Sequence, residues 1–174
     1  MSLRHAILGF LSARPMTGYD LRKTMTQTME HFWPVDQAQI YRTLSSLAED
    51  GLVRVETEVQ TTRPNRRIHH ILPAGEAELD DWLMSPLETE PTREPFVLRL
   101  FLAGQRGGGS VRALLTVRVG AMKLQISALK ALERTTKDAE EKGIAARLRL
   151  ATVENALAHA RAERDWAKAL LEEL

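Results

Sequence analysis

The chain has 174 residues, a formal net charge of +1, 44% hydrophobic residues and no cysteine. This length suits one domain, or a small domain with an accessory one, and the apolar fraction is sufficient for a core. Disulfides and thiolate metal sites are excluded, and no run of about 18 apolar residues predicts a transmembrane helix. Because Met1–His5 lacks the features of a signal peptide, we expect a cytoplasmic protein.

The charge is divided unevenly along the chain. Residues 1–85 contain nine basic and eleven acidic side chains, a net charge of −2, and residues 86–174 have a net charge of +3. A protein that binds nucleic acid through general basicity carries a larger positive charge. Any DNA contact made by this chain must therefore depend on a few cations in the right places.

Three short helices are predicted in the first third of the chain. The first covers residues 3–13 and is followed by a turn at Met16–Gly18. Thr17, with Asp20 three residues later, predicts the start of a second helix that runs to about His31. Its partly buried face is expected to carry Tyr19, Leu21, Met25 and Met29.

The third helix has the clearest end signals. Asp36 is the expected N-cap with Gln39 at the capping-box position, and Gly51 is placed to end the helix in a left-handed conformation. Its apolar stripe consists of Ile40, Leu44 and Leu47.

The residue pattern then changes to strands. Alternating apolar and charged residues over 53–59 predict a half-buried strand, residues 60–65 a polar loop, and residues 66–72 a second strand. Pro73 suits the first position of a further helix, which ends near Ser85. This helix is expected to carry the apolar residues Leu79, Trp82 and Leu83. Three helices followed by a β-hairpin predict a mainly α protein with a winged helix-turn-helix over residues 1–85.

The rest of the chain predicts a helical domain. Three prolines mark a linker over residues 86–95, and residues 96–103 predict a short helix that ends before the glycines at 107–109. Two long helices follow. The first has a heptad seam of Leu115, Val119, Met122, Ile126 and Leu129. The second has a seam of Leu150, Val153, Leu157, Ala160, Arg164, Ala167, Leu171 and Leu174.

These seams have two alternative partners. The helices can pack on each other as an antiparallel hairpin, or they can also pack on a second copy of the chain. A DNA-reading protein favours the second arrangement, because dimers bind two half-sites about 34 Å apart. We therefore expect residues 96–174 to form a dimerisation and effector domain. The expected dimerisation residues are Leu150, Val153, Leu157 and Leu171.

Four segments resemble the PadR family of bacterial transcriptional regulators, and the resemblance covers essentially the whole chain. They are Ile7–Gly9 with Pro15–Leu21; Phe32–Trp33 with Gln39–Tyr41, Leu44, Leu47 and Gly51–Leu52; Arg63–Pro64 with Arg66–Arg67; and Gly75, Leu79, Trp82 and Leu83. The chain departs from the family at Arg42, where proline is usual, at Leu72, where threonine caps the next helix, and at His69, where a tyrosine is usual. The resemblance implies a winged-helix repressor with a long helical C-terminal part, in which Trp82 occupies a core position.

The predicted DNA contacts come from the third helix and the wing. Glutamine and arginine suit adenine and guanine edges in a major groove, and a tyrosine hydroxyl suits a phosphate. Arginines on a hairpin can enter a minor groove or bind phosphates. Without the winged pattern, a polar helix face or an arginine cluster is more often simply solvated. The candidates are Gln37, Gln39, Tyr41, Arg42, Ser45, Arg63, Arg66 and Arg67, with Tyr19, Arg22 and Lys23 on the second helix.

A small-molecule site is implied by the resemblance alone. Phenolic acids and lipophilic drugs are known effectors of the family, and an effector would release the DNA. Aromatic and methionine residues at helical spacing are usually core residues. The candidate effector-binding residues are Trp33, Met122, His159 and Trp166, with Trp82 as a weaker one.

Enzyme activity is not expected. The run from Gly107 to Ser110 lacks the strand and the lysine of a phosphate-binding loop. The five histidines are scattered, and His69 and His70 would point to opposite faces of a strand. No cofactor or metal is expected.

The alternative to a DNA-binding regulator is a winged helix used for protein–protein assembly, which the near-neutral N-terminal part favours. A MarR-type regulator is disfavoured because that family also places dimer helices before the wing.

Overall fold

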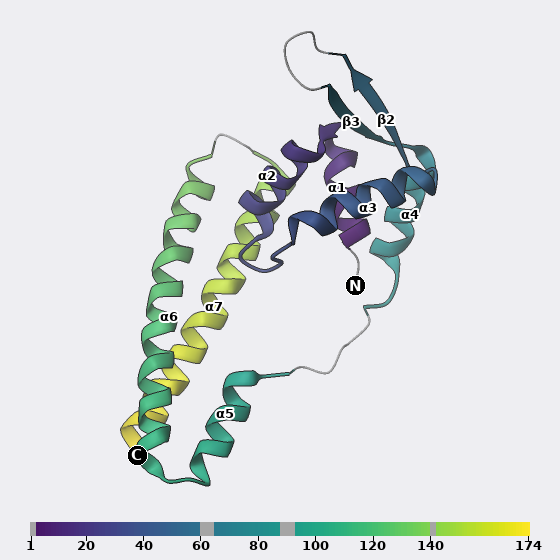
Figure 1. Ribbon diagram of the computed structural model, residues 1–174. Coiled ribbons are helices and arrows are strands. Elements are labelled where there is room, and N and C mark those ends of the chain that lie inside the picture. The colour runs from purple at the N-terminus through teal and green to yellow at the C-terminus, as the bar shows by residue number, and fades with distance from the viewer. Residues whose placement is uncertain (1–2, 60–64, 88–92, 140–141) are drawn as a thin grey trace. The chain divides into compact units, whose positions relative to one another are not determined.

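The computed structural model describes residues 3–59, 65–87, 93–139 and 142–174. The chain separates into two compact units, Met1–Glu88 and Thr89–Leu174 (Figure 1). The linker predicted over residues 86–95 includes residues 88–92, which lie outside the described residues. In the parts of the chain that the structure describes, no helix is both long and apolar enough to span a membrane.

The first unit is a winged helix-turn-helix. Its helices are α1 (Leu3–Ala13), α2 (Gly18–Met29), α3 (Gln37–Glu49) and α4 (Pro73–Met84). Its strands are β1 (Met16–Thr17), β2 (Val53–Glu58) and β3 (Arg66–Ile71), which form an antiparallel sheet in the order β1-β3-β2. Strands β2 and β3 form the wing, with Val53 opposite Ile71 and Glu58 opposite Arg66. The predicted mainly α fold with a winged helix-turn-helix is confirmed.

The helix boundaries follow local chemistry. The Thr17 hydroxyl oxygen accepts a hydrogen bond from the Asp20 backbone N–H (3.1 Å), and the Asp36 carboxylate accepts one from the Gln39 N–H (3.1 Å), so both predicted N-caps are confirmed. Gly51 has φ of +71°, the left-handed conformation that a glycine adopts at low cost after a helix.

The core of this unit lies between the helices and the base of the sheet. Helices α1, α2 and α3 each contribute an apolar stripe, and β2 contributes one residue. The side chains that are at most 3% exposed are Ile7, Leu8, Leu11, Leu21, Met25, Ile40, Leu44, Leu47 and Val53. This core fixes the angle between α3 and the wing, and it therefore positions the candidate interface.

Several details of the first unit differ from the sequence-based expectation. Met16 and Thr17 are not only a turn; they form the edge strand β1, paired with His69 and Ile68. Helix α2 ends at Met29 and not near His31. Tyr19 is 59% exposed because it lies on the first turn of α2, outside the apolar stripe.

Trp82 and Leu83 are not core residues. Trp82 is 39% exposed and Leu83 is 62% exposed, and in α4 only Gly75 and Leu79 are buried. The Trp82 indole instead stacks on the His5 ring of α1, with centroids 4.7 Å apart and planes 5° from parallel. Burial of His5 lowers its pKa, so the stacked imidazole favours the neutral form.

The second unit is a helical hairpin with a short helix packed on it. It consists of α5 (Pro95–Gly104), α6 (Gly108–Lys137) and α7 (Ile144–Glu173). Helices α6 and α7 lie side by side over most of their length (Figure 1). One core layer is made of Met122, Ile126, Leu129, Val153, Leu157 and Ala160. A second layer is made of Val111, Leu115, Val119 and Ala167, with Phe96, Leu100 and Ala103 of α5 packed against it.

The predicted seams of the two long helices are largely confirmed. All five seam residues of α6 are buried, as are Val153, Leu157, Ala160 and Ala167 of α7. Leu174 is 52% exposed, because α7 ends at Glu173 and the seam ends with it. Arg118 joins α6 to α7 through Glu163, with a 2.6 Å hydrogen bond from its Nε.

Candidate nucleic-acid interface

A cleft of about 520 Å³ opens between α3, the start of α2 and the wing. Leu44, Ala48 and Val55 form its apolar floor. Its polar walls come from three elements that are distant in sequence. They are Thr17, Tyr19 and Asp20; Tyr41 and Ser45; and Asn65, Arg66, Arg67 and His69.

Tyr41 is held at this cleft by close packing against α2. A Cβ atom at Gly18 would lie 2.6 Å from Tyr41 Cε1, closer than van der Waals contact allows. Only glycine at the first position of α2 therefore lets the Tyr41 ring lie against the backbone. The ring is still 41% exposed, so its hydroxyl can reach an external partner.

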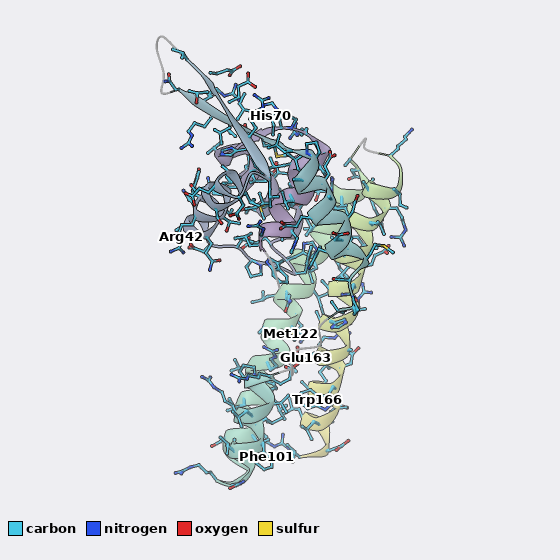
Figure 2. All side chains as sticks on the ribbon, turned by 90° about the vertical axis from the view of Figure 1, so that its right-hand side faces the viewer. Arg42, His70, Phe101, Met122, Glu163 and Trp166 are labelled. Carbon is cyan, nitrogen blue, oxygen red and sulfur yellow. The ribbon has the colours of Figure 1, made fainter. Side chains whose placement is uncertain are left out.

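The polar residues of α3 divide into two groups. Tyr41 and Ser45 line the cleft, and Gln37 lies one helical turn before Tyr41 on the same side. Gln39 and Arg42 are exposed on another side of the helix; Figure 2 shows Arg42 at the periphery of the winged unit. Arg42 and Tyr41 therefore face different sides of α3.

The two arginines at the start of β3 have different surroundings. Arg66 lies opposite Glu58 in the sheet, 3.6 Å from its carboxylate, and it also lies 3.7 Å from the Asp20 carboxylate. Arg67 lies opposite Thr57, and among the described residues no carboxylate is within ion-pair distance of it. Arg63 lies outside the described residues.

His69 is a buried histidine next to the cleft. It is 7% exposed, and its Nδ1 lies 3.3 Å from the Met16 carbonyl oxygen of β1. Burial lowers its pKa, and the charge of Arg67 acts in the same direction. His70 points to the other face, as predicted, and its Nε2 lies 3.1 Å from Glu56.

The candidates on α2 lie at the rim of the interface. Tyr19 lines the cleft, and the Arg22 guanidinium lies 5.5 Å from the centre of its ring. Lys23 is exposed and does not line the cleft. Tyr19 and Tyr41 therefore both line the cleft, and Arg22 adds a positive charge beside Tyr19.

The candidate effector residues do not gather at one place. Trp33 packs against the core of the winged unit, and Met122 is 5% exposed between α6 and α7, so it does not line a cleft. His159 and Trp166 do line a second cleft, of about 630 Å³, between α5 and α7. Figure 2 shows Trp166 and Glu163 together on α7 at this level of the helical hairpin. The other lining residues are Glu94, Val97, Ala158, Ala162 and Glu163.

The candidate dimerisation residues lie mostly inside the single chain. Val153 and Leu157 are 1% and 2% exposed under α6, and Leu150 and Leu171 are half-buried. Helix α5 shows the opposite behaviour, because it is rich in large apolar residues and none of its side chains is buried. Its exposed residues are Val97, Leu98, Phe101 and Leu102.

Sequence reasoning missed several residues of the interface. Asp20 was assigned only a capping role, Glu58 only a place in a strand, and Asn65 only a place in a loop. Asp20 and Asn65 line the cleft, and Glu58 lies opposite Arg66, which lines it. The pairing of β1 with β3 joins residues about 50 positions apart and so brings Asp20 close to Arg66. Among the described residues no cluster of histidines and carboxylates could hold a metal ion.

Comparison with known proteins agrees with this architecture. The model of the transcriptional regulator PadR-like family matches residues 7–81, and the model named virulence activator alpha C-term matches residues 92–174. The chain is a winged helix-turn-helix protein with a C-terminal helical hairpin. The winged unit is thus similar to the PadR-like family of transcriptional regulators.

Two curated relatives match the N-terminal part. A probable transcriptional regulator of Mycobacterium tuberculosis is 38% identical over 93 residues, which is 53% of this chain and 48% of that protein. The negative transcriptional regulator PadR of Bacillus subtilis is 30% identical over 101 residues, which is 57% of this chain and 55% of that protein. The chain thus spans about half the length of the curated relatives that it matches.

Solved structures match over nearly the whole length. Bacillus subtilis PadR in complex with operator DNA has a TM-score of 0.89 at 22% identity and covers 99% of this chain and 97% of its own. The Vibrio cholerae virulence activator AphA has a TM-score of 0.82 at 27% identity, with coverage of 99% and 97%. The fold is therefore the one shared by these regulators.

Proposed function

We propose that this chain is a sequence-specific DNA-binding transcriptional repressor that acts as a homodimer and is released by a small aromatic effector. The observation that carries the proposal is the cleft at which α3, the start of α2 and the arginine-bearing wing meet. The Bacillus subtilis relative named a negative transcriptional regulator, and the fold shared with an operator complex, support a DNA ligand and a repressor role.

Some residues of the candidate interface contact bases and others contact phosphates. Arg42 and the glutamines of α3 suit base edges in the major groove, and each good bidentate pair contributes about 1–3 kcal/mol of discrimination. Tyr41 and Arg67 contact phosphates, which fixes the register of α3 on the duplex. With about six phosphate contacts per dimer, the logarithm of the affinity falls against the logarithm of the salt concentration with a slope of about −5.

The second copy of the chain is the partner that covers α5. Four large apolar side chains of α5 are each between 45% and 66% exposed on a helix that buries none of its residues. Continuous apolar surface of this kind marks an interaction site. A dimer also supplies the two winged units that a two-half-site operator requires.

The cleft lined by His159 and Trp166 is the proposed effector site. Trp166 is 42% exposed and meets the Phe96 ring edge-to-face, with centroids 6.3 Å apart, so it offers an aromatic surface to a planar ligand. A solved structure of Bacillus subtilis PadR contains p-coumaric acid, which supports a small aromatic effector for this fold. An effector that binds better to the DNA-free arrangement would lower DNA affinity by that difference.

A gel-shift titration with the DNA upstream of the chain's own gene tests the proposal. We expect a shifted complex at low salt, weakened uniformly by Arg67→Ala and unaffected by Arg112→Ala, which removes an exposed arginine of α6. Failure to shift this DNA at low salt would contradict DNA binding and favour the assembly alternative. The effector is tested by adding p-coumaric acid to the wild type and to Trp166→Ala, which should release DNA only from the wild type.

A further inference from the structure

The strongest feature that the proposed function does not use is the pair of carboxylates around Arg66. The Arg66 guanidinium lies 3.7 Å from Asp20 and 3.6 Å from Glu58. Two negative charges thus surround one positive charge on the same wing that is proposed to contact DNA. The neighbouring Arg67 has no such partner among the described residues.

The two carboxylates lie next to Arg66 for different reasons. Asp20 lies in the first turn of α2, and its carboxylate accepts a 2.7 Å hydrogen bond from the Thr17 hydroxyl. Glu58 is the cross-strand partner of Arg66 in the hairpin. Neither group needs to move to reach the guanidinium, so the ion pairs are present before any DNA arrives.

We infer that Asp20 and Glu58 restrain Arg66 and thereby weaken the binding of random-sequence DNA. A phosphate can take Arg66 only by displacing two carboxylates that also repel it. Arg67 carries no such cost and binds phosphate in any duplex. The inference rests on the proposed DNA binding and adds to it an affinity-lowering role for two acidic residues.

The inference predicts how Glu58→Gln changes the affinity for random-sequence DNA and its salt dependence. Glu58→Gln removes one of the two carboxylates, leaves Asp20 in place, and so makes it easier for a phosphate to bind Arg66. Affinity for random-sequence DNA should rise roughly two- to fivefold, the range for an exposed ion pair. The salt slope should become steeper by about 0.9 for each additional phosphate contact.

The matched control is Glu56→Gln. Glu56 is on the same strand as Glu58, two residues away, and its substitution by glutamine removes the same charge. Glu56 pairs with Arg54 and His70 and not with Arg66. General removal of negative charge near DNA would strengthen binding in both variants. The inference requires a larger gain for Glu58→Gln than for Glu56→Gln.

A double-mutant cycle shows whether the gain passes through Arg66. In an Arg66→Gln background, Glu58→Gln should neither raise affinity more than Glu56→Gln does nor change the salt slope. Binding to a fluorescent random-sequence duplex is measured by anisotropy at several salt concentrations, and thermal unfolding by circular dichroism checks that each variant is folded.

Three results would overturn the inference. Equal gains for Glu58→Gln and Glu56→Gln would show simple removal of charge. A gain that persists without Arg66 would show direct repulsion of phosphate by Glu58. Absence of DNA binding by the wild type at low salt would remove the proposed function, and this inference with it. The first two results would leave DNA binding intact, so the two failures are distinguishable.

Discussion

The aromatic ring of Tyr41 on α3 lies against the backbone of Gly18, the first residue of α2, so closely that a Cβ atom at position 18 would displace the ring. This contact joins the two helices of the DNA-binding motif at the cleft. Gly18 therefore leaves space for the Tyr41 ring at the candidate interface, in addition to its place at the turn before α2.

Gly18→Ala should reduce DNA affinity with little loss of stability. The new methyl group would push the Tyr41 ring away from the cleft, and loss of a phosphate hydrogen bond costs about 1 kcal/mol, or roughly fivefold in affinity. The helix itself gains from alanine, by up to about 1 kcal/mol. Gel-shift titration and urea unfolding measure the two effects. Tyr41→Ala should lower affinity by a similar amount, and Gly18→Ala should add almost nothing to it; additive losses would contradict the packing explanation.

Arg42→Ala should lower affinity for the operator by about 1–3 kcal/mol and leave binding to random-sequence DNA nearly unchanged, because a base contact is specific to the site. Arg67→Ala should weaken both DNAs alike and make the salt slope less steep by about 0.9 per wing. Anisotropy titrations with both duplexes separate the two patterns. The assignment of Arg42 to a base edge fails if its loss weakens both duplexes equally.

The stability of the winged unit should fall as the pH drops below about 6.5. Burial lowers the pKa of His69 from an ordinary value of 6.5, so the unfolded chain binds the proton more tightly and acid favours unfolding. The contribution is complete above pH 6.5 and is lost as His69 becomes protonated. Urea unfolding followed by the fluorescence of Trp33 and Trp82, in a Trp166→Phe background, measures this unit.

His69→Phe removes this titrating group and should flatten the pH profile. The dependence that remains is expected from His5, whose pKa is also lowered by burial, and His5→Phe in the same chain should remove it. A profile as steep in His69→Phe as in the wild type would show that His69 is not the source.

Phe101→Glu should convert the dimer to a monomer without unfolding α5. Phe101 is 66% exposed in the single chain, so a carboxylate there is tolerated until a second copy must cover it. Light scattering gives the mass, and circular dichroism confirms the helical content. Leu83→Glu, at a 62% exposed position of α4, is the control and should keep the wild-type mass.

Leu157→Ala should destabilise the helical hairpin by about 2–5 kcal/mol, because the residue is 2% exposed and the cavity cannot collapse fully. The chain should keep its oligomeric state under conditions in which it remains folded. Urea unfolding combined with light scattering makes the comparison. A monomer that retains wild-type stability would instead show that Leu157 contacts a second copy directly.

The sequence predicted features that depend on neighbouring residues. Thr17 and Asp36 as caps, Gly51 as a left-handed end and the seam from Leu115 to Leu129 all have local signals, and the structure agrees with each of them. Trp82 was assigned to the core from the family resemblance, which does not show how far the core extends in this chain, where Trp82 is 39% exposed.

The candidate interface was predicted only in part, because some of its residues come together through pairing between distant segments of the chain. Tyr41, Ser45, Arg66 and Arg67 were expected at the DNA contact and all line the cleft. The proximity of Arg66 to Asp20 depends on the pairing of the two-residue strand β1 with β3, and two residues leave no periodic signal. The exposed apolar surface of α5 was also missed, because its sequence is that of an ordinary buried helix.

The outer strand of the wing has a consequence for how the protein behaves in concentrated solution. Strand β2 lies at the edge of the sheet, and Arg54, Glu56 and Glu58 alternate along it with less polar residues. An uncovered strand of six residues is a template on which another molecule can add its own strand, and charged side chains discourage that addition. Glu58, which is proposed to restrain Arg66, thus also helps to keep neighbouring molecules from aggregating through their sheets.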